Sequence, residues 1–375
     1  MIEWFTSRVV SSLVTVCLLA AFPGVLHADE ALQEPAIDVL PALPQTEGFA
    51  GAFAGISNGY MLVMGGANFP NGKPWEGGTK VWYRSVYAAR VEDLKPQQLS
   101  DKKQPDDGSP WKLIGELPGE RGYGLAVTHR DRIICVGGSN SKVHLSDVIA
   151  ISMQNHQLHV ETLPSLPMTL ANFSGALDQD TIYVAGGQET ASSVTASDRI
   201  WKLDLSEPQP KWTELASCPG PARILATSAA GQGSFWMMGG ASLRKGPDGK
   251  PLRTYLRDVW RYSGSTGWKQ MADLPMPLVG CPSPTLLQRD TPVIFGGDDG
   301  TQVGIDPQQH KGFRKSILRH IPGTGTADGS WSEIGQLPFG SVTTTAIPES
   351  NSIWIPSGEI RPGIRTPLVL KVSVP

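Results

Sequence analysis

A run of apolar residues that ends in two adjacent glycines recurs along the chain, and this repeat constrains the fold more than any other feature. The copies lie 49 to 72 residues apart, so a repeating unit is joined to loops of variable length. A sixth, degenerate copy ends in Ser357-Gly358. The five full copies end at Gly65-Gly66, Gly137-Gly138, Gly186-Gly187, Gly239-Gly240 and Gly296-Gly297.

The order of elements around each pair is constant. A strand of small residues such as Gly122–Val127 opens the unit, and a strand such as Asp147–Ala150 follows the loop after Gly-Gly. A run that begins with Trp and ends in Leu-Pro or a similar pair closes several units, as Trp111 to Pro118 does. Four strands in this order are typical of a kelch-type blade of a β-propeller. A β-sandwich with unrelated glycines would not keep this order.

Composition agrees with many short strands joined by turns. The 375 residues include 42 Gly and 31 Pro, and only 18 % are charged. A hydrophobic content of 40 % excludes a disordered chain, because that much apolar surface drives burial. The net charge of −3 gives no basic footprint, so we expect no nucleic-acid partner.

The last unit is incomplete, and the N-terminal part of the chain can complete it. The strands expected at Val342–Ala346, Ser352–Ile355 and Leu368–Val372 leave a fourth strand missing. Ile37–Pro44 is of the missing type, and its pairing there would remove an open sheet edge. The sequence therefore predicts an all-β fold, a six-bladed kelch-type β-propeller over residues 29–375 whose last blade is closed by the N-terminal strand.

Residues 1–28 resemble a secretory signal peptide. Arg8 precedes the uncharged run Val9–Ala28, which ends before the acidic Asp29-Glu30. An uncleaved anchor is the alternative, since the run could span a bilayer. Pro23 and Gly24 favour cleavage, so we expect a secreted or periplasmic protein without stable membrane insertion. Three cysteines then remain, an odd number that leaves at least one unpaired; Cys135 reads as a buried apolar residue.

Because strands alternate in direction within a blade, the loops after Gly-Gly and the residues before each first strand share one rim. A concave rim with arginines and carboxylates suits a polar, anionic small molecule. The alternatives are that Arg121 and Arg223 bond loop carbonyls, and that Asp298-Asp299-Gly300 is simply a turn. No histidine spacing indicates a metal site. The residues gathered on this rim are Trp75, Glu76, Arg121, Arg223, Arg244, Asp298, Asp299, Glu359, Arg361 and Arg365.

Several segments are more specific than the glycine pairs. They are Gly48–Ile56, Gly65–Pro70 with its continuation Pro74–Tyr83, Arg121–Gly124, and Gly358–Thr366. Together they resemble the N-acetylneuraminate epimerase (sialic acid mutarotase) family of kelch propellers. In that family the Glu…Arg motif lies nearer mid-chain, whereas here it is in the last unit. The chain thus resembles a cyclically permuted branch.

The resemblance implies an isomerase that interconverts anomers of N-acetylneuraminate or a related acidic sugar by general acid–base proton transfer. It implies Glu359 and Arg365 as catalytic residues, with no cofactor and no metal. A non-catalytic carbohydrate- or protein-binding propeller is the alternative. An exposed apolar patch on the rim would favour that alternative. The substrate-binding residues we expect are Asn68, Trp75, Glu76, Arg121, Arg223 and Arg361.

Overall fold

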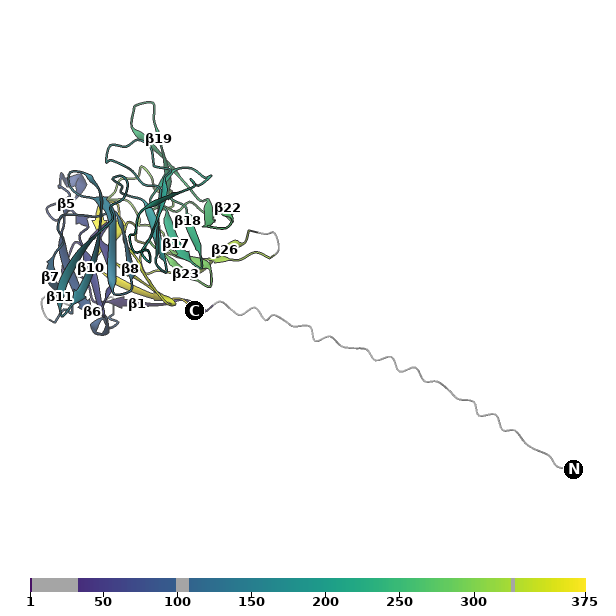
Figure 1. Ribbon diagram of the computed structural model, residues 1–375. Coiled ribbons are helices and arrows are strands. Elements are labelled where there is room, and N and C mark those ends of the chain that lie inside the picture. Colours follow the sequence, from purple (N-terminus) through teal and green to yellow (C-terminus); the bar gives the residue numbers. More distant parts are fainter. Residues whose placement is uncertain (2–32, 99–107, 325–327) are drawn as a thin grey trace. The chain divides into compact units, whose positions relative to one another are not determined.

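The computed structural model describes Met1 and residues 33–98, 108–324 and 328–375 (Figure 1). The chain divides into two units, residues 1–32 and 33–375, and only the second is described here. The expected signal peptide, residues 1–28, lies outside the described residues apart from Met1. Within the described ranges, no helix has both the length and the apolar character that crossing a membrane requires.

Strands dominate the second unit, as the sequence predicts, and the all-β prediction is confirmed. The only helices among the described residues are two single 3₁₀ turns, Pro74–Glu76 and Val91–Asp93. The described strands include six four-stranded antiparallel sheets. Sheet 1 has β2 (Phe53–Ser57), β3 (Tyr60–Met64), β6 (Ser85–Arg90) and β7 (Lys112–Glu116); sheet 2 has β8 (Leu125–His129), β9 (Arg132–Ser139), β10 (His144–Gln154) and β11 (Gln157–Leu163); sheet 3 has β12 (Ser174–Asp178), β13 (Thr181–Ala185), β14 (Ile200–Asp204) and β15 (Thr213–Leu215).

The second half of the chain repeats the pattern. Sheet 4 has β17 (Thr227–Gly231), β18 (Ser234–Met238), β21 (Val259–Ser263) and β22 (Gly267–Met271); sheet 5 has β23 (Leu286–Gln288), β24 (Thr291–Phe295), β25 (Ser316–Ile321) and β26 (Ser330–Gln336); sheet 6 has β27 (Ile347–Glu349), β28 (Ser352–Pro356), β31 (Val369–Ser373) and β1 (Ala36–Leu40). Among the described residues, three smaller sheets involve the loops after the glycine pairs, two of two strands and one of three. They are β4 (Ala67–Asn68) with β5 (Val81–Trp82), β19 (Ala241–Lys245) with β16 (Arg223–Ile224) and β20 (Pro251–Tyr255), and β29 (Glu359–Arg361) with β30 (Ile364–Arg365).

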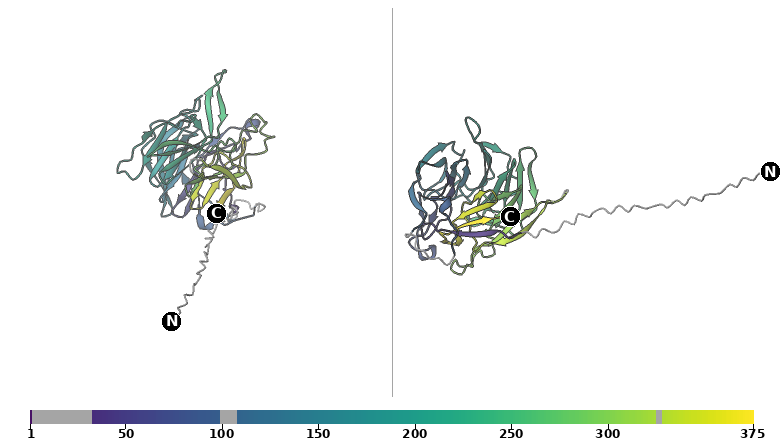
Figure 2. Two further views of the ribbon diagram at one scale, coloured as in Figure 1. Left: turned by 90° about the vertical axis from the view of Figure 1, so that its right-hand side faces the viewer. Right: turned by 90° about the horizontal axis from the view of Figure 1, so that it is seen from below.

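Sheet 6 takes its outer strand from the start of the described unit. Strand β1 pairs antiparallel with β31, with registers running from Ala36↔Ser373 to Leu40↔Val369. Figure 2 shows the purple β1 strand beside the yellow C-terminal strands. This is the pairing that the sequence predicts, and it covers the edge of β31 that would otherwise be open.

A ring of six backbone hydrogen bonds joins the beginnings of all six sheets. Each N–H donates to the carbonyl of the equivalent residue in the preceding sheet, at 2.6 to 2.9 Å, and the sixth bond returns to the first residue. All six residues have a positive φ between 51° and 65°. We call this ring the collar; its members are Gly51, Tyr123, Asn172, Leu225, Gly280 and Thr343.

The collar corrects two of the predicted strands. Gly122–Val127 and Val342–Ala346 read as continuous strands in the sequence, but the observed strands begin only at Leu125 and Ile347. Tyr123 and Thr343 are the cause, because a left-handed backbone interrupts an extended strand.

The glycine pairs join neighbouring sheets. Gly66 N–H donates to the Arg121 carbonyl of the next sheet at 2.8 Å, and Gly358 N–H donates to the Phe49 carbonyl at 2.9 Å. A β-carbon on Gly65 would lie 2.3 Å from that Arg121 oxygen, and its φ of +62° already disfavours other residues. The repeated pair is therefore required by the close approach between sheets.

The repeated tryptophans bond across the same joints. Their indole N–H groups donate at 2.8 to 2.9 Å to carbonyls at the end of the fourth strand of the preceding sheet. For Trp111 the acceptor is Pro41, directly after β1, so sheets 1 and 6 are joined like the others. The remaining pairs are Trp212 with Pro164, Trp268 with Ala216, and Trp331 with Ala272.

The cysteines contribute to packing. Cys135 and Cys281 are buried among apolar side chains, and burial raises the pKa of each thiol to about 12. Cys218 is half-buried, with a pKa raised to about 11 by the same cause. None of these three cysteines is in a disulfide.

Leu43 tests how much the N-terminal segment stabilises the fold. Its side chain is fully buried, and its N–H donates to Pro367 O at 2.9 Å. We expect Leu43→Ala to lower the free energy of unfolding by about 2–5 kcal/mol, because it leaves a cavity in the core. Urea denaturation measures this. Leu113→Ala, at a position 63 % exposed, is the control and should change little; equal effects of the two variants would show that the segment does not hold sheet 6.

Candidate functional site

The six residues that directly follow the glycine pairs, or Ser357-Gly358, occupy equivalent positions next to the collar. Each forms an antiparallel bridge with the residue that precedes a collar residue, as Glu359 does with Val342 and Asp298 with Val279. We call these six the rim residues: Ala67, Ser139, Gln188, Ala241, Asp298 and Glu359. Only Asp298 and Glu359 are acidic. They belong to neighbouring sheets, because Thr343 N–H donates directly to Gly280 O at 2.7 Å.

Glu359 and Arg365 face each other across a tight hairpin. Strands β29 and β30 pair Glu359 with Arg365 directly. The Glu359 Oε1 atom accepts a 2.6 Å hydrogen bond from Gly363 N–H and lies 3.5 Å from Arg365 Nη2. The carboxylate is therefore held in place by backbone and guanidinium together.

Arg365 is buried but incompletely bonded. Its side chain is 5 % exposed, and its Cζ atom lies 4.7 Å from the centre of the Phe69 ring, a cation–π contact. Within the described part of the chain, Nε and Nη1 have no hydrogen-bond partner. A buried guanidinium with free donors is costly unless an acceptor is supplied.

Trp75 covers the same hairpin. A β-carbon on Gly363, whose φ is +78°, would lie 2.9 Å from Trp75 Cζ3. The tryptophan therefore packs against the turn between Glu359 and Arg365. Of the residues expected in the site, the structure brings Glu359, Arg365 and Trp75 together.

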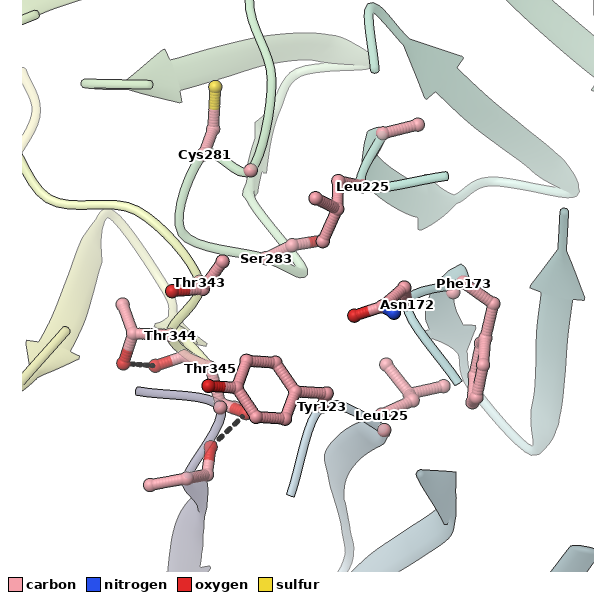
Figure 3. Close-up of a pocket in the computed structure, with 16 residues that line it drawn as sticks. Tyr123, Leu125, Asn172, Phe173, Leu225, Cys281, Ser283, Thr343, Thr344 and Thr345 are labelled. Atoms are coloured by element: carbon pink, nitrogen blue, oxygen red, sulfur yellow. Dashed lines mark hydrogen bonds between the residues drawn. The ribbon is translucent and has the colours of Figure 1, made fainter. Parts of the chain in front are cut away.

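The collar side chains surround a central cavity of about 60 Å³ (Figure 3). The Asn172 amide points into this space, and its Nδ2 atom donates to Gln188 Oε1 at 3.2 Å. On the Tyr123 ring lies Lys80, with Nζ 4.3 Å from the ring centre. Glu359 and Arg365 do not line this cavity, although Thr343, next to Glu359's bridge partner, does.

Arg121 and Arg223 are not rim groups, which corrects the expectation that they face the mouth. Both are buried, 3 % and 1 % exposed, at the position where Leu170 and Leu278 lie in other sheets. Arg223 forms a two-point ion pair with Asp258 at 2.6 and 2.8 Å, and its Nε donates to Pro221 O. Arg121 pairs with Asp147 through Nη2 alone, and among the described residues its Nε and Nη1 find no hydrogen-bond partner. The expected alternative, a structural role, agrees with these contacts.

Asn68 and Glu76 also have local partners. Asn68 is fully buried, accepts a hydrogen bond from the Tyr83 hydroxyl and donates to Gly48 O, each at 2.8 Å. Burial raises the pKa of Tyr83, so the hydroxyl remains a donor. Glu76 is exposed, and its carboxylate accepts a hydrogen bond from Lys73 N–H. This bond caps the 3₁₀ turn Pro74–Glu76, to which Glu76 itself belongs. These contacts place both side chains in the scaffold rather than toward a ligand.

Arg361 is half-exposed in β29, and the described residues show no ion pair for it. Arg244 is exposed in the β19–β20 hairpin that projects in Figure 1. The contact between Phe69 and Arg365 is not predicted from the sequence, although Phe69 lies within the family-like segment Gly65–Pro70. Its aromatic ring is the one sequence feature that indicates a partner for a buried arginine.

A second feature of the rim is a pair between Tyr255 and Asp298. The Tyr255 hydroxyl donates to Asp298 Oδ2 at 2.8 Å. Asp298 also lines a cavity of about 370 Å³ formed by its own loop. Burial, followed by the bond to Asp298, raises the pKa of Tyr255 well above its usual range. The sequence shows Asp298 as part of a turn and gives no indication of this partner.

Comparison with known proteins confirms the resemblance seen in the motifs. The family model for N-acetylneuraminate epimerase matches residues 30–160. Proteins named N-acetylneuraminate epimerase from Escherichia coli strains HS and K12 are 28 % and 27 % identical over 252 residues, covering 60 % of this chain and 64 % of theirs. The chain thus spans somewhat less than two thirds of the length of these relatives.

A solved structure titled "Structure of YjhT" agrees with the fold. The TM-score is 0.58 with 13 % identity, and the match covers 76 % of this chain and 84 % of that one. The Gly358–Thr366 segment lies beyond the residues that the family model matches.

Arg223 provides a test of its scaffold role. We expect Arg223→Ala to lower the free energy of unfolding by about 3–5 kcal/mol, because it leaves the Asp258 carboxylate without its partner in a nearly buried site. Urea denaturation is the measurement. Arg199→Ala, which removes an exposed pair with Glu214, is the matched control and should leave the unfolding midpoint unchanged. A fully stable Arg223→Ala variant would contradict a structural role.

Proposed function

We propose that the six sheets are the blades of a six-bladed kelch-type β-propeller. The hydrogen-bonded collar supports this, since it returns to its starting residue. The Trp111–Pro41 bond and the Gly358–Phe49 bond support closure between sheets 6 and 1. In this arrangement the rim residues surround one mouth of the ring.

We propose that the chain is a mutarotase that interconverts the anomers of N-acetylneuraminate or a related acidic sugar. The observation that carries the proposal is a rim carboxylate, Glu359, beside a buried arginine with two unpartnered donor nitrogens. The resemblance to N-acetylneuraminate epimerases adds the substrate class. A carboxylic sugar supplies the acceptor that Arg365 lacks.

The proposed chemistry needs only proton transfers. Ring opening requires the anomeric hydroxyl to lose a proton and the ring oxygen to gain one, while the ring C–O bond breaks and its electron pair goes to the ring oxygen. Rotation about the bond beside the new carbonyl exposes its other face, and the transfers then reverse. Glu359 exchanges one of these protons with the sugar.

Arg365 orients the substrate. A guanidinium binds a carboxylate through two parallel N–H bonds, which fixes the carbon that bears it. The anomeric carbon of a sialic acid carries this carboxylate, so binding by Arg365 brings the anomeric centre close to Glu359. Trp75 provides an aromatic face on the same side, and the half-exposed Arg361 adds positive charge.

Glu359→Gln tests the proton transfer. The amide keeps the shape and can still bond Gly363, but it cannot exchange the proton, so we expect the anomer-exchange rate to fall about 10²- to 10⁴-fold. NMR exchange spectroscopy on the free sugar with purified protein measures this rate. Arg365→Lys should weaken binding of an acidic sugar and affect a neutral sugar much less. Unaltered exchange in Glu359→Gln would remove the mechanism.

The second candidate is a non-catalytic carbohydrate- or protein-binding propeller. It is favoured by large apolar side chains that are exposed in the loops after the glycine pairs: Val143, Leu252, Val303 and Ile305. They lie in three separate loops, whereas the Glu359–Arg365 pair is a single site. Binding of a sugar without any acceleration of its anomer exchange would support this candidate.

We also propose that residues 1–28 direct export to a secreted or periplasmic location. The basic start and the apolar run that precedes Asp29 support it. Cleavage predicts a mature protein that begins near Asp29. N-terminal sequencing of the protein from its native host that finds Met1 intact would rule cleavage out.

A further inference from the structure

Ring opening needs two proton transfers at two oxygens of the sugar, and Glu359 supplies one group. The rim has one other carboxylate, Asp298, among its six positions. We propose that Asp298 is the second proton-transfer group of this site and that Tyr255 positions it. The inference rests on the mutarotase function proposed above.

The first argument is equivalence of position. Asp298 bridges to Val279 as Glu359 bridges to Val342. The next residues, Gly280 and Thr343, are joined by a 2.7 Å collar bond. The two residues therefore occupy equivalent backbone positions on neighbouring sheets.

The second argument is access. Asp298 is only partly buried and lines the cavity of about 370 Å³, together with Lys311 and Arg314. Gly312, in the wall of this cavity, lies against the Glu359 hairpin: a β-carbon there would be 3.4 Å from Ile360 O. The cavity thus adjoins β29, and Lys311 in its lining adds a positive charge beside Asp298.

The third argument is how Asp298 is held. Its Oδ1 atom accepts from Gly300 N–H at 3.0 Å, and Oδ2 accepts from the Tyr255 hydroxyl at 2.8 Å. The Tyr255 ring packs on Gly300, where a β-carbon would lie 2.9 Å from its Cδ1 atom. By contrast, the adjacent Asp299 is committed to an ion pair with Arg314. Each Asp298 oxygen keeps a lone pair for the sugar.

The proposed cycle carries one proton between the two carboxylates. In ring opening, ionised Asp298 takes the proton of the anomeric hydroxyl, whose oxygen becomes the carbonyl oxygen. Protonated Glu359 gives its proton to the ring oxygen as the ring C–O bond breaks. Ring closure on the other face of the carbonyl returns both protons, so the enzyme is unchanged after each cycle.

Anomer exchange measured by NMR on purified full-length protein tests the proposal, with N-acetylneuraminate as the probe. We expect Asp298→Asn to slow exchange by about 10²-fold or more. The double variant Asp298→Asn/Glu359→Gln should be little slower than the slower single variant, because groups that act as a unit are not additive. Asp306→Asn, in an exposed turn of the same loop, is the matched control.

Tyr255→Phe separates positioning from folding. It should lower the exchange rate at saturating sugar by about tenfold, with the half-saturating concentration unchanged, because one hydrogen bond to a charged group is lost. Tyr262→Phe, in β21 of sheet 4, should change neither. Thermal melting of each variant shows whether it is folded.

The outcomes are distinct. Wild-type protein that does not accelerate exchange overturns the proposed function and this inference together. Exchange that Glu359→Gln abolishes but Asp298→Asn leaves unchanged overturns the inference alone. If Asp298→Asn does not fold, an unchanged rate in Tyr255→Phe overturns it.

Discussion

The collar is the constraint on which the rest of the structure depends. Each of its six backbone bonds joins two sheets that are separate in their own strand pairing. Each member must hold a positive φ to point N–H and C=O around the ring. For Tyr123, Leu225 and Thr343 this costs about 1–3 kcal/mol per residue. Such backbone persists only when its surroundings determine it, and here the glycine joints and the tryptophan bonds act on the same sheets.

The same joint explains why two arginines lie in the core. At five of the six positions, the carbonyl of the residue two before a collar residue accepts a hydrogen bond from the glycine pair of the preceding sheet, as those of Arg121 and Arg223 do. Its side chain must then enter the space beneath the loop. Leucine fills this space at Leu170 and Leu278, whereas the arginines need Asp147 and Asp258 as partners. Charge at this position serves packing between strands and not the surface.

The sequence contains enough to predict the strands, their order and the pairing of β1, because glycine and tryptophan have local roles that recur. The collar cannot be predicted from the sequence, since Tyr123 and Thr343 are residue types with no preference for left-handed backbone. For the same reason the sequence predicts which loops form the rim, but it does not predict which of their side chains face a ligand and which bond to the scaffold. Whether Asn68 faces a ligand or Tyr83 depends on a neighbour 15 residues away, and this is decided only by the β4–β5 pairing.

The six rim residues share one backbone arrangement but differ in their side chains. Their backbone is fixed by a bridge to the residue that precedes a collar residue, and this bridge does not depend on the identity of their side chains. Ala67 and Ala241 occupy the position with no polar group at all, and Ser139 and Gln188 with neutral ones. Acidic residues at Asp298 and Glu359 therefore cannot be explained by the joint itself. Each carboxylate is instead oriented by a hydrogen bond of its own. The Tyr255 hydroxyl donates to Asp298, and Gly363 N–H donates to Glu359. The two oriented carboxylates on adjacent sheets, and the buried Arg365 beside Glu359, are therefore the features of the rim that the bridges do not require.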